Sequence, residues 1–326
     1  MSREMIWMMA GVLALLVTAS IAGWVMSRRA GPDKPGVANF NARTRSWWVM
    51  VGIFAITLWL GHWTTVVLFC FLSFLALREF ITLNETRVCD HKVLFWCFFV
   101  ILPLQYFLVG IHWYGMASIF IPVYGFIFIP VRKVLSGETK DFLATTAKIQ
   151  WGMLVCVYFV SHMPMIMTLP IKGWSGGNGP LLFFFVACAQ ASDVFQYCWG
   201  KAMGKRRIAP LLSPNKTVEG TVGGIATTVL LGVGMSFVTP FNPWQAALMA
   251  LLICLAGFFG GLVMSAIKRD LGAKDWGNTI AGHGGVMDRI DSLCFAAPLF
   301  YHFTVFYFGT GMDPSPPEWI FGLLGK

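Results

Sequence analysis

WQAALMALLICLAGFFGGLVM, residues 244–264, is an uncharged stretch in a chain of 326 residues. An α-helix rises about 1.5 Å per residue, so roughly 20 apolar residues cross the hydrocarbon core of a bilayer. Similar runs occur at residues 5–26, 46–61, 64–83, 93–110, 115–131, 150–169, 180–198, 221–239 and 292–309. The chain is 57% hydrophobic and 12% charged, too apolar for two soluble domains. We therefore predict an all-α polytopic integral membrane protein with about ten transmembrane helices (nine to ten).

The distribution of basic residues predicts the orientation of these helices. With the N-terminus outside, only Arg3, Lys172 and Lys326 of the 24 lysines and arginines lie outside. Such a bias marks the cytoplasmic side. We expect a multi-pass protein of the cell inner membrane, if the source is bacterial, with its charged loops in the cytoplasm. Topology and anionic lipid then account for the net charge of +9, so no nucleic-acid partner is predicted.

Composition divides the chain into four parts. Residues 1–45 are predicted to form an uncleaved membrane anchor helix and a basic cytoplasmic linker, because residues 30–46 are rich in Pro, Gly and Asn. Residues 46–175 form an N-terminal helical bundle. Residues 176–310 form a second membrane domain with the charged loops, and residues 311–326 form a short non-cytoplasmic tail. The cysteines lie mostly in apolar runs without a CxxC pair, which indicates small core residues.

Asp193 lies in AQASDVFQYCWGK, near the cytoplasmic end of the run at 180–198. A carboxylate at membrane depth costs several kcal/mol unless it has a partner, which favours a functional role. The alternative is a simple interfacial acid near Lys201.

The segment GKRRIAPLLSPNKTVEGTVGG, residues 204–224, has the pattern of a helix start. Ser213 followed by Pro214 predicts an N-cap and a first-turn proline, with Lys216, Thr217 and Glu219 in the opening turns. Free N–H groups at such a position favour phosphate, and Lys216 adds a full charge. The segment is no P-loop, because Asn215 replaces the required glycine. The glycines at 220 and 224 are expected to serve close helix packing.

The stretch SAIKRDLGAKDWGNTIAGHGGVMDRID, residues 265–291, concentrates charge of both signs. Lys268, Arg269 and Lys274 supply positive charge, and its aspartates supply oxygen ligands that suit Mg²⁺. Asp288 and Asp291 are spaced i, i+3, on one face at a helix start. The glycines beside His283 would let the backbone approach a phosphate or adopt unusual dihedrals. The alternative, a solvated loop, does not explain glycines around a histidine just before paired aspartates.

This stretch resembles the signature of the phosphatidate cytidylyltransferases, the CDP-diacylglycerol synthases. The K-R, K-D, H-G-G and D-R-x-D elements occur in order and at the right spacing. SPNKTVEG resembles the family segment S-P-x-K-T-x-E-G, and Asp193 in SDVFQY resembles the family's aspartate at that helix end. The match is specific over residues 190–310 and topological before that. Ala281 stands where the family usually has proline, and the anchor before Arg45 looks additional, so a divergent paralogue is one reading.

The resemblance implies that CTP and phosphatidate form CDP-diacylglycerol and pyrophosphate. It implies Asp288 and Asp291 as primary Mg²⁺ ligands, Asp193 and Asp275 as supporting ligands, and K⁺ as a second cation. The roles implied for the remaining residues are phosphate contact for Lys216, Lys268, Arg269, Lys274, Arg289, Gly284 and Gly285, a hydrogen bond to phosphate or a loop contact for His283, and capping of the Lys216 turn for Ser213, Thr217 and Glu219. A homodimer is also implied.

Three alternatives from other functional classes stay open. A cytidylyltransferase for another lipid phosphate would share all the phosphate chemistry. A non-catalytic paralogue could act as a membrane scaffold. A transporter would also have many spans, but its charges are expected near the midplane, whereas these acids cluster at the inner interface.

Overall fold

The computed structural model describes residues 3–31, 34–84, 86–137, 139–171, 174, 177–279 and 284–308. Its α-helices are α1 (Arg3–Ala30), α2 (Pro35–Leu60), α3 (His62–Leu83), α4 (Val88–Trp96), α5 (Leu102–Gly110), α6 (Tyr114–Ile119), α7 (Phe126–Val134), α8 (Phe142–Met153), α9 (Val160–Ile166), α10 (Gly179–Met203), α11 (Val218–Gly234), α12 (Pro243–Asp270) and α13 (Met287–Phe308). Three π-helical segments join α4 to α5, α6 to α7 and α8 to α9: η1 (Cys97–Ile101), η2 (Phe120–Gly125) and η3 (Leu154–Phe159). A single 3₁₀ turn, η4 (Ser236–Val238), follows α11, and an antiparallel hairpin joins β1 (Arg207–Ala209) to β2 (Ser213–Thr217).

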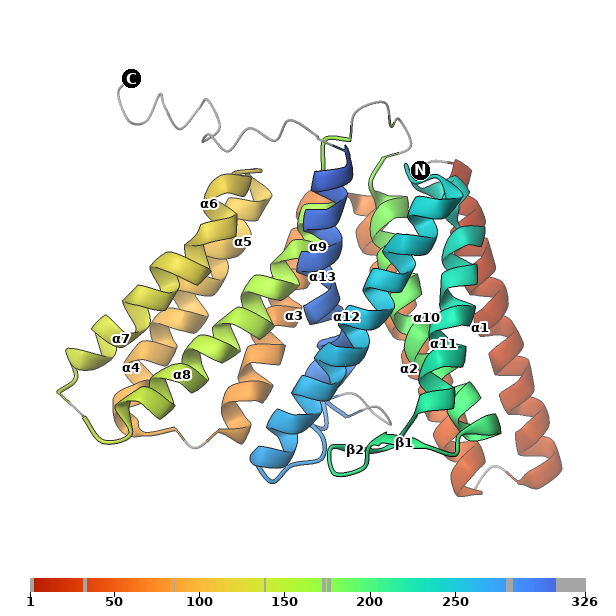
Figure 1. The fold of residues 1–326 in the computed structure, drawn as a ribbon, viewed down its shortest axis with the longest axis horizontal. Helices are drawn as coiled ribbons and strands as arrows, with labels where there is room; N and C mark the ends of the chain where they lie inside the picture. The colour runs from red at the N-terminus through yellow and green to blue at the C-terminus, as the bar shows by residue number, and fades with distance from the viewer. Residues whose placement is uncertain are drawn as a thin grey trace.

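The helices lie side by side as long rods (Figure 1). The start of α1 and the end of α13 lie at one end of the bundle, and the β1–β2 hairpin lies at the other, which we call the hairpin end. The C-terminal ends of α1, α3, α7 and α12 also lie at the hairpin end. The chain therefore alternates between the two ends, as expected of successive membrane crossings.

The prediction of an all-α polytopic membrane protein is confirmed, because most of each of the ten apolar runs lies in helical structure. Among the described residues, seven helices are long and apolar enough to cross a membrane: Ile6–Ala30, His62–Leu83, Asp90–Gly110, Tyr114–Val134, Phe142–Ile166, Gly179–Met203 and Pro243–Asp270. The other runs lie in α2, α11 and α13, of 26, 17 and 22 residues. The number of crossings and the orientation stay predictions.

The prediction of a flexible linker over residues 30–46 is wrong for most of that segment. Helix α2 begins at Pro35, which suits a first helical turn because its missing N–H would have no partner there. The indole of Trp48 donates to Ser20 Oγ at 2.9 Å, and the amide of Asn41 donates to Ser27 Oγ at 2.9 Å. These contacts between α1 and α2 make the two helices an antiparallel pair.

Two glycines of α11 confirm the predicted close helix packing. A Cβ at Gly220 would lie 2.8 Å from the backbone oxygen of Gln196, and one at Gly224 would lie 2.5 Å from the Gln196 side chain. Side chains at these positions would push α11 away from α10. Because α10 carries Asp193 and α11 follows Lys216, this packing sets the distance between two of the predicted site residues.

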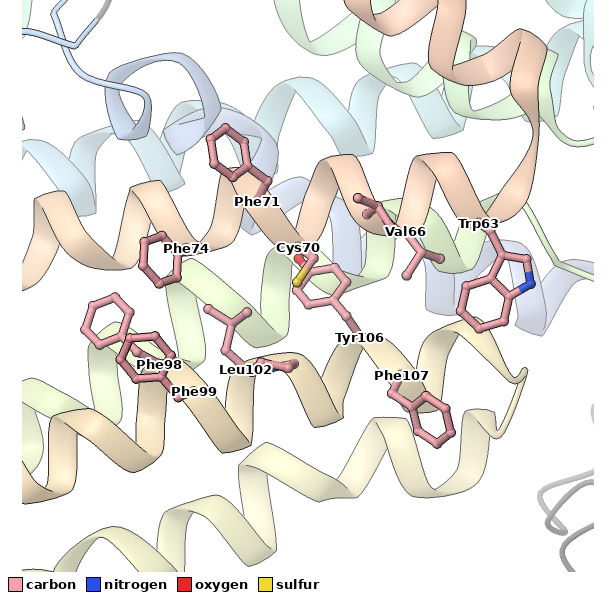
Figure 2. Close-up of a pocket in the computed structure, with 12 residues that line it drawn as sticks. Trp63, Val66, Cys70, Phe71, Phe74, Phe98, Phe99, Leu102, Tyr106 and Phe107 are labelled. Atoms are coloured by element: carbon pink, nitrogen blue, oxygen red, sulfur yellow. The ribbon is translucent and has the colours of Figure 1, made fainter.

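An apolar groove of about 460 Å³ lies along α3 and the η1–α5 segment (Figure 2). Aromatic side chains such as Phe74, Phe99 and Phe107 line it, and the hydroxyl of Tyr106 is bonded to Ser73 at 2.6 Å. None of the described residues that line the groove is charged. A surface of this composition suits lipid tails rather than a nucleotide.

The α10–α11 contact can be tested by substitution of its glycine. Gly224→Ala should lower the free energy of unfolding by about 1–3 kcal/mol, because the added methyl group overpacks the helix interface. Gly234 of α11 is a matched control, since nothing lies within 4 Å of its added Cβ. Thermal unfolding in detergent measures both variants. Equal stability of Gly224→Ala and Gly234→Ala would contradict the packing described above.

Candidate active site

Charged side chains from four elements meet at the hairpin end of the bundle. They are Asp193 of α10, Lys216 of β2, Lys268 of α12, and Asp288 and Asp291 of α13. Each lies where an apolar helix or its adjoining segment reaches this end, so the membrane-spanning elements deliver them to a common region. The structure thus brings together five residues from four elements of the chain.

Lys268 and Asp288 form a buried ion pair at the centre of the cluster. The distance from Lys268 Nζ to Asp288 Oδ1 is 2.8 Å, and the two side chains are 11% and 6% exposed. Asp288 Oδ2 accepts from the backbone N–H of Trp276 at 2.9 Å and of Gly285 at 3.0 Å. Both oxygens of Asp288 therefore bind protein donors, and this carboxylate ties α12 and the following loop to the start of α13.

Asp193 and Asp291 are linked through Ser292. The Ser292 hydroxyl donates to Asp193 Oδ2 at 3.0 Å, and the Ser292 N–H donates to Asp291 Oδ1 at 2.8 Å. The second oxygen of each carboxylate has no hydrogen-bond donor within the described part of the chain. Asp193 is exposed and Asp291 is half-buried. Two neighbouring carboxylates with free oxygens repel each other, so the pair favours a bound cation.

Lys216 extends from β2 toward the same acids. Its Nζ lies 4.8 Å from the ring centroid of Phe258, and a Cβ at Gly261 would lie 3.3 Å from it, so this glycine leaves room for the ammonium. Burial lowers the pKa of Lys216 below its ordinary value, and the charges of Asp193 and Asp291 oppose that shift. The ammonium is therefore a positive charge held beside two carboxylates.

The predicted helix start at Ser213 is wrong. Ser213 pairs with Ala209 and Thr217 pairs with Arg207 in the hairpin, so the chain stays extended through Lys216. Helix α11 begins at Val218, and the Thr217 hydroxyl accepts from the N–H of Gly220 at 3.1 Å. Strand pairing thus overrides the serine–proline signal, and Thr217 is the N-cap.

Glu219 caps a different turn from the one predicted. Its carboxylate accepts from the backbone N–H groups of Lys205 at 2.9 Å and Arg206 at 3.1 Å. These donors lie at the start of the hairpin, so Glu219 anchors the hairpin to α11 rather than orienting the Lys216 turn.

Three predicted residues, Arg269, Lys274 and Asp275, are exposed. Arg269 donates to the carbonyl of Ala273 at 3.0 Å, a contact at the end of α12. No group of three or more His, Cys, Asp or Glu side chains within the described ranges could hold one metal ion. The four predicted metal ligands are therefore not assembled as one set.

Arg289 and His283 complete the predicted charged residues. Arg289 is half-buried, and the side-chain amide of Gln190 donates to its backbone oxygen at 3.3 Å. The positive charge of Arg289 interacts favourably with the carboxylate of Asp193. His283 and the neighbouring Ala281 lie outside the described residues.

Two glycines of the signature, Gly284 and Gly285, leave room for carboxylate oxygens in this structure. Gly284 has a φ of +82°, which L side chains rarely adopt, and a Cβ there would lie 2.8 Å from Asp288 Oδ2. A Cβ at Gly285 would lie 2.4 Å from Glu79 Oε2. The N–H of Gly285 already donates to Asp288. The predicted tolerance of unusual dihedrals is thus confirmed at Gly284, whereas phosphate contact by these two glycines stays a prediction.

Glu79 of α3 was missed by the sequence reasoning. This carboxylate is 7% exposed and accepts from the Thr279 hydroxyl at 2.6 Å and from the N–H groups of Val286 and Met287, each at 2.9 Å. A signal was present, because Glu79 is an acid inside the apolar run at 64–83. Its partners lie some 200 residues away in sequence and could not be inferred from one chain.

Comparison with known proteins identifies the family of this chain. A model of the cytidylyltransferase family matches residues 41–307. The chain belongs to the cytidylyltransferase family. The family match covers the N-terminal helical bundle as well as the charged segments.

Three relatives of this cytidylyltransferase differ in whether a function is assigned to them. The uncharacterized protein YnbB of Escherichia coli (strain K12) is 38% identical over 296 residues, which are 90% of this chain and 96% of that protein. A phosphatidate cytidylyltransferase of Synechocystis sp. is 43% identical over 154 residues, 44% of this chain and 52% of that protein. Another, of Staphylococcus haemolyticus, is 28% identical over 239 residues, 72% of this chain and 88% of that protein.

The position of the helix cap before α11 can be tested directly. Thr217→Ala should lower the free energy of unfolding by about 1 kcal/mol, because the N–H of Gly220 loses its acceptor. Ser213→Ala is the matched control and should change it by less than about 0.5 kcal/mol. Denaturant titration in detergent separates the two. A larger loss for Ser213→Ala would restore the cap predicted from the sequence.

Proposed function

We propose that this cytidylyltransferase makes CDP-diacylglycerol and pyrophosphate from CTP and phosphatidate at the cytoplasmic face of the membrane, with Mg²⁺. The observation that carries the proposal is the pair of carboxylates, Asp193 and Asp291, held beside the cations Lys216 and Lys268. The names of the relatives from Synechocystis and Staphylococcus haemolyticus support the choice of lipid. With the N-terminus outside, as predicted, the hairpin end faces the cytoplasm, where CTP is available.

The main requirement of this reaction is to bring two negatively charged substrates together. A phosphate oxygen of phosphatidate attacks the α-phosphorus of CTP, a new P–O bond forms, and the bond to the β-phosphate oxygen breaks to release pyrophosphate. The attacking oxygen is already anionic near neutral pH, so a general base contributes little. The main barrier is repulsion between two polyanions, which fixed cations lower.

The carboxylate pair fits a magnesium ion. Mg²⁺ commonly takes one or two carboxylates and completes its shell with water and substrate phosphates. Asp193 and Asp291 would hold the ion through the oxygens that have no donor among the described residues. When bound, Mg²⁺ neutralises charge on the departing pyrophosphate. Asp288 is less suited as a ligand because its oxygens already bind Lys268 and two backbone N–H groups.

The protein's own cations would complete the site. Lys216 and Arg289 are half-buried and their positive charges act on Asp193, which supports contacts with phosphate groups of either substrate. Lys268 is paired with Asp288, so its charge is largely offset by that carboxylate. A second cation such as K⁺ and a homodimer stay predictions of the family resemblance.

A different lipid phosphate is the second candidate substrate. The relative that covers nearly the whole chain, YnbB, is uncharacterized, and helix α1 precedes the region matched by the family model. These two facts leave the lipid less well supported than the nucleotide chemistry.

The proposed activity can be measured on purified protein in detergent with labelled CTP. Phosphatidate should give labelled CDP-diacylglycerol, and omission of Mg²⁺ should abolish it, because the pyrophosphate charge is then unneutralised. An isoprenoid phosphate tested in parallel should give no product. Product from the isoprenoid lipid alone would redirect the substrate assignment. No CDP-lipid under any condition would support a scaffold role instead.

The carboxylate pair has its own test. Asp291→Asn and Asp193→Asn should each lower kcat by about 10²- to 10³-fold, because each removes a negative ligand that would hold the metal ion whose charge offsets that of the transition state. Asp141→Asn is the control, since Asp141 is an acid of the α7–α8 connection with a side chain that is 55% exposed. Retained turnover in Asp291→Asn with intact folding would rule out the proposed metal ligand.

A further inference from the structure

We infer that Glu79 is a positioning residue of the active site, through which the N-terminal bundle sets the location of the start of α13. The inference rests on the proposed function only where it concerns turnover. Asp288, Arg289 and Asp291 all lie in the first turns of α13. Whatever holds the first residues of that helix therefore sets the position of the charges that follow them.

The Glu79 carboxylate binds residues that follow α12 and residues at the start of α13. The Thr279 hydroxyl donates to Oε1 at 2.6 Å. The N–H of Val286 donates to Oε1 at 2.9 Å, and the N–H of Met287 donates to Oε2 at 2.9 Å. One carboxylate thus joins two points of the chain that are separated by seven positions.

Glycines at 277 and 285 leave room for this carboxylate. A Cβ at Gly277 would lie 3.1 Å from Glu79 Oε1, and one at Gly285 would lie 2.4 Å from Oε2. Next to Glu79, the ring of Phe80 stacks on Trp276 with a centroid distance of 5.4 Å. The end of α3 therefore holds the loop through two adjacent residues, one polar and one aromatic.

These contacts reach the charged cluster in two steps. Helix α13 begins with N–H groups that have no acceptor in their own helix, and Glu79 supplies acceptors for Val286 and Met287. Asp291 lies about one helical turn after Met287, so its location follows from theirs. The N–H of Trp276, stacked on Phe80, donates to Asp288 at 2.9 Å. Contacts with α3 thus position both aspartates of the D-R-x-D element.

Glu79 is no candidate for a catalytic group. Its two oxygens already accept three hydrogen bonds from the loop, and the residue is buried. An acid–base or metal-binding role would require those bonds to break. A role in positioning uses the bonds as they stand, and displacements of about 1 Å at an active site can cost about 10²-fold in rate.

The test combines hydrogen exchange with kinetics on Glu79→Gln in the full-length protein. The neutral amide keeps the size of the side chain but presents one acceptor oxygen instead of two. Amide exchange over residues 284–290, followed by mass spectrometry, should become at least about tenfold faster as these contacts open more readily. The kcat for CDP-lipid formation should fall by about 10²-fold. KM for CTP should change by less than about threefold, because Lys216 and Arg289 are untouched.

A buried acid elsewhere in the same bundle gives the matched control. Asp90 of α4 is 1% exposed and pairs with Lys133 at 2.9 Å. Asp90→Asn should lower thermal stability while leaving exchange over residues 284–290 and kcat per folded molecule unchanged. Thr279→Val removes one of the three donors to Glu79 and should give an intermediate effect on both readouts, which keeps the test available if Glu79→Gln does not fold.

Each result decides a separate question. If Glu79→Gln loses stability as Asp90→Asn does, with unchanged exchange over residues 284–290 and unchanged kcat, the positioning role is overturned. Faster exchange with reduced kcat supports it. If the wild-type protein forms no CDP-lipid, the proposed function fails, whereas the exchange comparison still supports or overturns the Glu79 contact on its own.

Discussion

A buried carboxylate in an apolar protein is destabilising unless hydrogen-bond donors surround it, and this constraint organises the hairpin end of the bundle. Glu79 and Asp288 meet it with backbone N–H groups, a hydroxyl and the ammonium of Lys268. Each of the two carboxylates accepts hydrogen bonds from residues of the segment between α12 and α13. At Gly277, Gly284 and Gly285 of that segment, an added Cβ would lie 3.1, 2.8 and 2.4 Å from a carboxylate oxygen, so a larger side chain would displace it.

With those two acids satisfied, the remaining pair is available for chemistry. Asp193 and Asp291 share Ser292 and keep one oxygen each without a donor among the described residues. Lys216 reaches the same pair from the hairpin, where Gly261 leaves room for its ammonium. The cluster thus separates into acids that hold the structure and acids that can bind a cation, a division that residue type alone does not reveal.

The apolar periodicity predicted the helical runs well because a bilayer imposes one length on every span. The N-cap at Ser213 failed for a tertiary reason, since pairing with β1 keeps the chain extended as far as Thr217. The linker over residues 30–46 failed because Pro35 starts a helix there instead of ending one. Local signals of Pro and Ser are ambiguous in this way: the same residues begin helices, form turns and occupy edge strands.

The sequence by itself determined the membrane class, the segments that carry charge and the resemblance to cytidylyltransferases, because these depend on composition and on motifs that are continuous in the chain. Only the tertiary structure decided which acids bind protein donors and which keep free oxygens. It also brought Glu79, from a helix of the N-terminal bundle, to the start of α13. Hydrogen bonds between residues some 200 positions apart follow from how the helices pack, and a single sequence does not encode that packing in any local pattern.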